Sequence, residues 1–353
     1  MSRRIPDILK SNLPLPIGRN QTGSSSSSKG KQLAFTGDPA DPRNYRVEDL
    51  LMALNDNRTR ENAILLLNKI RISGNEKLGL LLWNCPGAIF ALLQEIMKIY
   101  YVLSTPELTE VAAKKVCDAL ALIQTVAAHP ETKKEFVRAN FAEYLYPLLN
   151  PKYVEKPFEY LRVNSLGVIG SLLKEAATDG EIIKYLIDGS VIPKCLFSME
   201  VGGPLTKSVG GLIIEKLLNT DLGAKYCVWN AKVVNVMTRV FGQIVDQDLA
   251  IITPSNYQLR RYIINCYLRL SEDTRACTSL KTVLPLRFSD PTFWNMLFDD
   301  EIARANLERL FSNVFPEHHR AAEVRPSEQH FGYYYSLVPA PPGGSSSMPR
   351  RNF

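Results

Sequence analysis

Few side chains in this sequence are arranged like the parts of a catalytic site. The chain has four histidines, of which His129 is followed directly by proline and glutamate and the other three lie near the C-terminus. His129 could act as a general base, but a histidine at such a turn more commonly hydrogen-bonds the turn itself. The segment GGPLTKS from Gly202 resembles a phosphate-binding loop, yet Thr206 stands where that loop requires glycine. We therefore predict no catalytic residues and no bound cofactor.

Six cysteines are scattered along the chain, with no two of them within four residues of each other. A zinc site would need closely spaced pairs of cysteines, so we predict no metal site. Each cysteine lies in or beside an apolar helical stretch, which is typical of reduced thiols in the core of a cytosolic or nuclear protein.

The densest basic and aromatic cluster in the body of the chain contains Tyr257, Arg260, Arg261 and Arg269. Such a cluster could contact nucleic-acid phosphates or acidic peptides. An ordinary solvated helix face is the alternative interpretation. Three tryptophans, Trp83, Trp229 and Trp294, are candidates for core positions or interface anchors. We predict that Trp83 lies in the core, because it stands inside an apolar run.

The net charge of +6 gives little support to a nucleic-acid footprint in the body. Residues 1–44 hold seven Lys and Arg against three Asp and Glu, and residues 316–353 hold four against three. Only one net positive charge therefore remains between them, so that any such footprint must come from local clustering. The longest apolar stretch, 78–93, is interrupted and too short to cross a bilayer, and we expect no membrane partner.

The elements that must position these residues are predicted to be helices. In the segment TRENAILLLNKI, apolar residues recur every three or four positions, as on one face of an amphipathic helix. Further along the chain, several prolines stand near expected helix starts, where a missing N–H costs little. These prolines are Pro106, Pro130, Pro157, Pro204, Pro254 and Pro291. The sequence therefore predicts an all-α fold.

Strongly apolar helices with small or aliphatic central residues recur along residues 45–315. Their spacings are 56, 46, 45 and 54 residues, and two of these lie near the armadillo period of roughly 40–47. We predict an armadillo-like solenoid of about six repeats, with an irregular helical domain as the alternative. The central residues of the recurring helices are Ala63, Ala119, Ser165, Gly210 and Ile264.

Residues 1–44 and 316–353, rich in Pro, Gly and Ser, are predicted to be disordered tails.

Several strings make the prediction more specific. Residues 45–315 contain, in order, TRENA, ALLQEI, VCDALAL, HPET, PFEYLR, SLGVIG and CYLRLS. This ordered set resembles the "required for cell differentiation" family, the forty-kilodalton armadillo subunit of the CCR–NOT (carbon catabolite repression–NOT) deadenylase complex. The resemblance implies six armadillo repeats without nuclease activity. It also implies docking on the NOT scaffold and recruitment of RNA-binding regulators through tryptophan-containing or short helical peptides.

The resemblance assigns two binding surfaces to residues of this chain. The scaffold-docking segment reads LWNCPGAIFALLQEI here, and it places Cys85, Pro86, Phe90 and Met97 at the docking surface. Pro86 replaces an aromatic residue and Phe90 replaces alanine. The peptide pocket is implied at Val233, where the family has a different residue, and at Arg275, which matches a pocket-lining arginine. These departures indicate a divergent paralogue.

We thus predict a non-catalytic adaptor that links the NOT scaffold to RNA-binding regulators in messenger-RNA deadenylation, decay and translational repression. We expect such a subunit to be located in the cytoplasm and the nucleus. It also implies homodimerisation and nucleic-acid binding for some members. Two alternatives stay open at this point: an armadillo protein that binds nucleic acid directly through its basic patch, and an adaptor that has diverged to act outside the complex.

Overall fold

The computed structural model describes residues 45–149, 153–174, 179–247 and 254–316, and every regular element within them is a helix. This confirms the predicted all-α class. The chain divides into two compact units, Met1–Ala176 and Ala177–Phe353. The predicted tail 1–44 and all but the first residue of the predicted tail 316–353 lie outside the described residues, so the predictions about them remain predictions.

The first unit consists of three successive helical groups in the part of it that the structure describes. Each group ends in a helix that is longer than the ones before it. The groups are α2 (Val47–Ala53) with α3 (Arg60–Ile72); α4 (Leu78–Asn84), α5 (Ala88–Met97) and the 3-10 helix η2 (Tyr100–Val102) with α6 (Glu110–Ala128); and α7 (Lys133–Arg138), the 3-10 helix η3 (Phe141–Tyr144) and α8 (Tyr146–Leu149) with α9 (Lys156–Leu172).

The described part of the second unit repeats this organisation with three further groups. They are α10 (Gly180–Asp188) and α11 (Val191–Val201) with α12 (Pro204–Leu218); α13 (Asp221–Trp229) and α14 (Ala231–Gln247) with α15 (Pro254–Ser271); and α16 (Thr274–Val283), the 3-10 helix η4 (Leu286–Ser289) and α17 (Pro291–Asn295) with α18 (Glu301–Val314).

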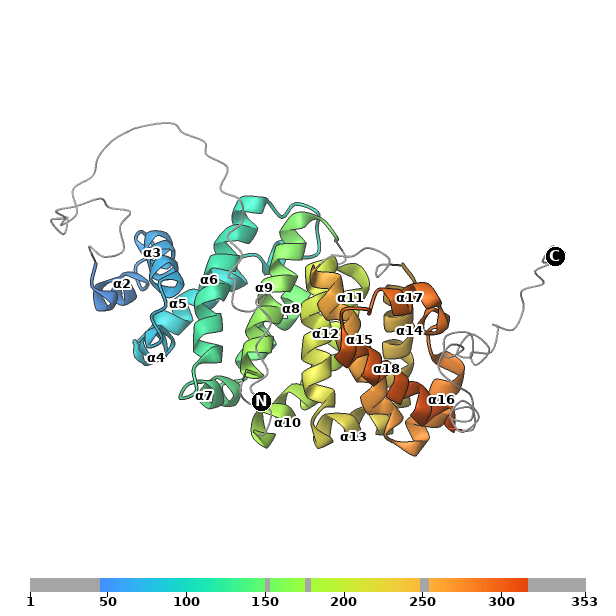
Figure 1. Cartoon of the computed structure of the whole chain (residues 1–353). Helices are drawn as coiled ribbons and strands as arrows, with labels where there is room; N and C mark the ends of the chain where they lie inside the picture. The colour runs from blue at the N-terminus through green and yellow to red at the C-terminus, as the bar shows by residue number, and fades with distance from the viewer. Residues whose placement is uncertain (1–44, 150–152, 175–178, 248–253, 317–353) are drawn as a thin grey trace. The chain divides into compact units, whose positions relative to one another are not determined.

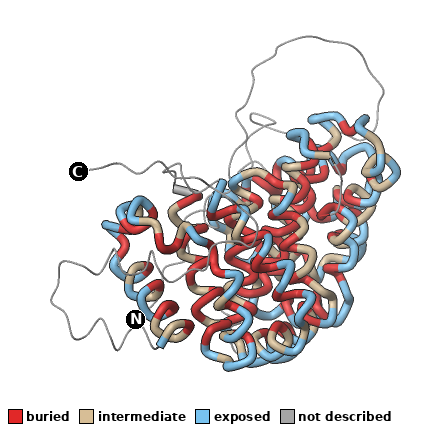
Figure 2. Tube along the Cα trace, turned by 90° about the vertical axis from the view of Figure 1, so that its right-hand side faces the viewer, coloured by how far each residue is buried: buried red, intermediate tan, exposed pale blue. Residues whose placement is uncertain are grey.

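The last helix of each group packs against the last helix of the neighbouring group in the same unit. In the first unit α6 lies between α3 and α9, and in the second α15 lies between α12 and α18 (Figure 1). The five repeat centres expected from the sequence fall in these helices, and those in α6, α9 and α15 are fully buried. Figure 2 shows buried residues concentrated where helices face one another and exposed residues on outer faces and turns. The predicted repetition is therefore present in both units.

Local signals explain where the helices begin. Pro157, Pro204 and Pro291 occupy the first turns of α9, α12 and α17, as expected for a residue without an N–H to leave unpaired. Side-chain oxygens accept backbone N–H bonds at the start of other helices, which stabilises orphan donors there. These caps are Thr109, Asp179, Thr220, Asp273, Asp290 and Asp300.

Within the described ranges, no single helix has both the length and the apolar character needed to cross a bilayer. Leu78–Asn84 and Ala88–Val102 meet those two criteria only when taken together, and they are bent by 93° relative to each other.

Candidate functional site

The first candidate surface begins at the tight turn between α4 and α5. Gly87 has φ of 80°, a left-handed conformation that glycine adopts without strain. A Cβ at this position would also lie 2.3 Å from Oδ1 of Asn55. The Asn55 side chain holds the turn by donating a hydrogen bond from Nδ2 to the Pro86 carbonyl at 3.1 Å. The turn therefore sets the direction in which α5 leaves α4.

A largely buried ion pair between Arg60 of α3 and Glu95 of α5 holds these two helices together. Arg60, 5% exposed, donates to Oε1 of Glu95 at 3.0 Å and from Nε to the Leu54 carbonyl at 2.7 Å. Lys98 also contacts Glu95 at 2.6 Å. Burial alone would raise the pKa of Glu95, but the bonds from Lys98 and Arg60 outweigh it and lower that pKa. These contacts of Glu95 fix the position of α5, the helix that carries Phe90.

Opposite α5, aromatic residues of η3 form the other wall of an open groove. The rings of Phe136 and Phe141 lie 4.6 Å apart, and those of Phe141 and Tyr144 lie 5.9 Å apart. The Tyr100 hydroxyl donates to the Tyr144 carbonyl, and burial raises the pKa of Tyr100 to about 12. We call this cavity of about 430 Å³ the Phe90 groove; it is lined by Trp83, Asn84, Cys85, Pro86, Gly87, Ile89, Phe90, Leu93, Ala139, Phe141 and Tyr144.

The structure brings together three of the four residues that the resemblance places at the docking surface. Cys85, Pro86 and Phe90 all line the Phe90 groove, and the Phe90 side chain is 65% exposed. Met97 does not line it, but lies two turns further along α5 from Phe90 and is also exposed. The exposed ring of Phe90 lies in a groove with other apolar and aromatic side chains, and an exposed apolar patch of this kind is a feature of binding surfaces.

One prediction about this region needs correction, and other residues were missed. Trp83 is half-buried and lines the groove, whereas its apolar neighbourhood predicted a core position. The groove also draws on Phe141 and Tyr144, which no local signal marked as groove residues. They follow Asn140, whose left-handed φ of 52° turns the chain between α7 and η3. This aromatic wall depends on a contact between segments about fifty residues apart.

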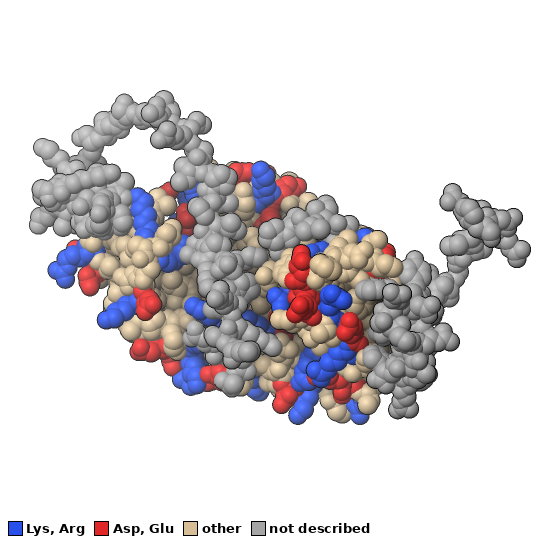
Figure 3. Space-filling view, viewed as in Figure 1, with Lys and Arg blue, Asp and Glu red and all other residues tan. Residues whose placement is uncertain are grey.

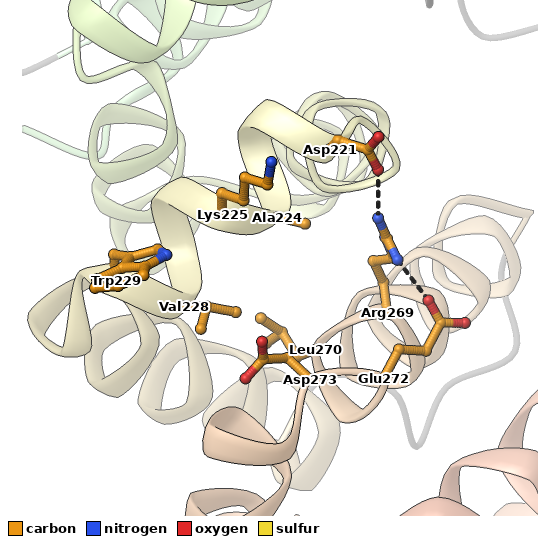
Figure 4. Close-up of a pocket in the computed structure, with 9 residues that line it drawn as sticks. All are labelled: Asp221, Ala224, Lys225, Val228, Trp229, Arg269, Leu270, Glu272 and Asp273. Atoms are coloured by element: carbon orange, nitrogen blue, oxygen red, sulfur yellow. Dashed lines mark hydrogen bonds and ion pairs between the residues drawn. The ribbon is translucent and has the colours of Figure 1, made fainter.

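The second candidate surface lies between α13 and the end of α15. Asp221, Ala224, Lys225, Val228 and Trp229 recur at helical spacing and therefore share one face of α13. With the end of α15 they enclose a cavity of about 190 Å³ (Figure 4). We call it the Trp229 cavity; its lining residues are Asp221, Ala224, Lys225, Val228, Trp229, Arg269, Leu270, Glu272 and Asp273.

Arg269 organises the charged side of this cavity (Figure 4). Its guanidinium contacts Oε2 of Glu272 at 2.6 Å and Oδ1 of Asp221 at 3.2 Å. Its Nε donates to the Leu218 carbonyl at 3.2 Å, which ties the end of α12 to the same network. Because these pairs are partly solvated, their net contribution to stability is small. Their consequence is that the opposite charges of the rim compensate one another.

The two residues that the resemblance places in the peptide pocket differ in their exposure to solvent. Val233 is 6% exposed on α14 and therefore offers little surface to a ligand. Arg275 is exposed, and its guanidinium carbon lies 4.5 Å from the ring centroid of Trp229. Trp229 itself is 73% exposed. The structure thus pairs Arg275 with a tryptophan that the sequence left open as core or anchor, while Trp294 is 4% exposed and lies in the core.

The basic and aromatic cluster does not form one solvent-facing patch. Arg260 is 1% exposed, and burial lowers the pKa of its guanidinium. Arg261 lies 3.2 Å from the buried carboxylate of Asp300 and 6.0 Å from the ring centroid of Tyr257. Arg269 belongs to the network of the Trp229 cavity. Because their nearest contacts are within the protein, these side chains are poorly placed to neutralise phosphates.

The other charged side chains on the described surface also do not indicate a basic patch for nucleic acid. On the face drawn in Figure 3, Lys and Arg side chains are interspersed with Asp and Glu instead of gathering into one basic area. Among the described residues, no group of three or more His, Cys, Asp or Glu is placed to hold a metal ion.

Two kinds of similarity connect the chain with known proteins. The family model described as "Cell differentiation family, Rcd1-like" matches residues 50–314. Cell differentiation protein rcd1 of Schizosaccharomyces pombe is 38% identical over 272 residues, which cover 76% of this chain and 93% of that protein. Protein CAF40 of Saccharomyces cerevisiae is 37% identical over 258 residues, which cover 73% of this chain and 68% of that protein.

Solved structures agree with the armadillo-like fold. A designed armadillo repeat protein has a TM-score of 0.52 at 14% identity and covers 76% of this chain and 100% of its own. An engineered protein has a TM-score of 0.53 at 15% identity and covers 77% of this chain and 99% of its own. At such identities the likeness concerns the fold alone, and it confirms the predicted armadillo-like class. From the family match and the identities to its relatives, the chain belongs to the Rcd1-like cell differentiation family.

Proposed function

We propose that this protein is a non-catalytic adaptor subunit of the CCR–NOT deadenylase complex. In this role it links the NOT scaffold to RNA-binding regulators and acts on messenger RNA in the cytoplasm and the nucleus. Membership of the Rcd1-like family supports the proposal, as does the resemblance of its ordered strings to the armadillo subunit of that complex.

The observation that carries the proposal is the Phe90 groove. The residues that the resemblance assigns to scaffold docking include Cys85, Pro86 and Phe90, which line this largely apolar cavity. A groove with exposed aromatic side chains suits the apolar face of an amphipathic helix, whose anchors recur every three or four residues. We infer that such a helix of the NOT scaffold lies in the groove and covers the exposed ring of Phe90.

A binding role also suits the second surface. Two of the charged groups around the Trp229 cavity, Asp221 and Glu272, are engaged by Arg269. The exposed indole of Trp229 lines this cavity and also contacts the guanidinium of Arg275. Aromatic and arginine side chains are the residues most enriched at the centres of protein interfaces. We infer that short peptides of RNA-binding regulators bind here.

The test is a pull-down of the cognate NOT scaffold by the full chain. We expect the wild type to retain the scaffold and Phe90→Glu to lose it, because a carboxylate cannot be desolvated against an apolar helix face. Phe298→Glu is the matched control, since Phe298 is similarly exposed at 73% but lies in the second unit. Absence of scaffold binding by the wild type would contradict the proposal and favour an adaptor that acts outside the complex.

A second variant asks how the two departures from the family pattern affect docking. The double substitution Pro86→Phe with Phe90→Ala restores the residue types of that pattern in the groove. If the bulkier Phe90 side chain hinders the partner, this variant should bind the scaffold more tightly than the wild type, because overpacking at an interface is destabilising. Unchanged affinity would mean that the partner has adjusted to Phe90.

A further inference from the structure

Trp229 and Arg275 form an aromatic–cation pair at the surface of the second unit. Trp229 ends α13, and its neighbour Asn230 has non-helical dihedral angles (φ −115°, ψ 81°). Arg275 stands in the first turn of α16, where Asp273 accepts its backbone N–H at 2.9 Å. The guanidinium carbon lies 4.5 Å from the indole centroid, well within the range of a cation–π contact.

The indole of Trp229 also forms part of the wall of the Trp229 cavity (Figure 4). Arg275 is not among the residues that line this cavity. The indole therefore contacts Arg275 while it bounds the open space beside Val228 and Leu270. If the side chain of Trp229 rotated outward, the stacking surface of Arg275 would become available next to that space.

We propose that Trp229 is an intramolecular competitor for the arginine of the peptide pocket. In this arrangement the chain's own indole occupies the stacking position on Arg275 that a tryptophan of a bound peptide would take. A peptide must displace Trp229 before its own ring can stack there. The inference rests on the proposed function, because it concerns the control of the peptide site described above.

The surroundings of Trp229 favour displacement over a fixed structural role. A tryptophan that is 73% exposed has lost little water on folding, so few packing contacts hold it in place. A cation–π contact at an exposed site is weak, and the non-helical backbone at Asn230 ends the helix directly after this residue. The pair can thus open at low cost, which would lower the affinity for a competing peptide without abolishing it.

The experiment measures binding of a fluorescein-labelled synthetic peptide, one tryptophan flanked by glycine and serine, to the full chain by fluorescence anisotropy. Trp229→Ala should bind this peptide about two- to fivefold more tightly than the wild type, the factor that an exposed cation–π contact represents. Arg275→Ala should lose binding, and adding Trp229→Ala to it should restore nothing. Phe298→Ala, which removes another ring with 73% exposure, should leave the affinity unchanged.

A second measurement follows Trp229 directly. In the ¹⁵N-labelled full chain, the indole N–H signal of Trp229 is identified by its absence in Trp229→Phe. Saturating unlabelled peptide should move this signal toward its position in Arg275→Ala, because both conditions release the indole from the guanidinium. The tryptophan of the unlabelled peptide gives no signal and cannot be confused with it.

Unchanged or weaker peptide binding by Trp229→Ala would overturn the inference, and weaker binding would show that the indole is a platform for the ligand. Failure of both wild type and Trp229→Ala to bind the peptide would overturn it as well. The scaffold pull-down reports separately on the proposed function. Tighter peptide binding by Trp229→Ala in a chain that fails to retain the scaffold would support the competitor and refute membership of the complex.

Discussion

The Phe90 groove of the first unit and the Trp229 cavity of the second each begin with a short helix held close to a longer one by a glycine. In α4, a Cβ at Gly79 would lie 2.5 Å from the Thr125 carbonyl oxygen of α6. In α13, a Cβ at Gly223 would lie 2.0 Å from the Leu217 carbonyl oxygen of α12. The same device therefore positions the first wall of both surfaces.

The two surfaces differ in where their charges lie. In the first unit the ion pair between Arg60 of α3 and Glu95 of α5 is largely buried, and neither residue lines the groove, whose walls are mostly apolar and aromatic. In the second, Arg269 and Glu272 stand at the rim of the cavity and are about one-third exposed or less. One helical architecture thus yields a mostly apolar groove and a small cavity with a charged rim.

The largest loss of stability is expected from substitution of Gly79 or Gly223, the glycines that bring α4 and α13 close to their neighbouring helices. Gly223→Ala should destabilise the protein by about 3 kcal/mol, because the new methyl group meets a backbone carbonyl that cannot move aside cheaply. Gly79→Ala, with a less severe clash, should cost about 2 kcal/mol. Urea unfolding measures both. Gly242→Ala in α14 is the control, since a Cβ there meets nothing within 4 Å and should be neutral or slightly stabilising. Equal stability of all three variants would contradict the role of the close contacts.

The next effect tests the difference in burial of the ion pairs. Glu95→Gln should cost about 2 kcal/mol at pH 7, because Arg60 would lose the charged acceptor of a hydrogen bond in a protected site. Glu272→Gln should cost less than about 1 kcal/mol, and that cost should shrink in high salt. A larger effect at Glu272 than at Glu95 would reverse the comparison.

The cost of Glu95→Gln should also depend on pH. The folded-state pKa of Glu95 lies below its usual value, so its carboxylate contributes stability above the pKa of the unfolded chain, about 4.3. That contribution is lost as the pH falls through the lower, folded-state pKa. The difference between wild type and Glu95→Gln should therefore narrow below about pH 4.3, as urea unfolding at several pH values would reveal. A constant difference across this range would show that the charge is not responsible.

The smallest changes in stability are expected from removal of the exposed aromatic rings of Phe90 and Trp229. Phe90→Ala should change the free energy of unfolding by no more than about 0.5 kcal/mol and Trp229→Ala by no more than about 1 kcal/mol, because both side chains are mostly exposed and only the ring of Trp229 also contacts Arg275. Urea unfolding again provides the measurement. A large loss of stability in either variant would mean that the ring supports its unit, and the binding results would need reinterpretation.

Much of the fold was predictable because it depends on signals that are local in the chain. Apolar residues at three- and four-residue spacing mark the helices, and Pro157, Pro204 and Pro291 mark helix starts. The recurring central residues fell in the long helices because each repeat buries the same kind of face. Of the candidate sites, the groove residues Cys85, Pro86 and Phe90 followed from a resemblance carried by short strings.

The exposure of individual side chains was harder to predict. Arg260 and Arg261 are adjacent in sequence, yet one is buried and the other is paired with Asp300, the residue that caps α18. Successive helical residues point about 100° apart, so that neighbours in sequence face different surroundings. For the same reason Trp83, expected in the core, is half-buried in a groove, and Val233, expected in the peptide pocket, is buried.

The sequence alone determined that this chain is helical, repetitive and related to one family, since periodicity and ordered strings survive without knowledge of distant contacts. Only the tertiary structure decided which side chains meet. The contact of Trp229 with Arg275 joins segments about fifty residues apart, and so does the groove that Phe90 lines together with Phe141 and Tyr144. Such contacts depend on how successive helices pack, and the tryptophan on the pocket arginine is a product of that packing.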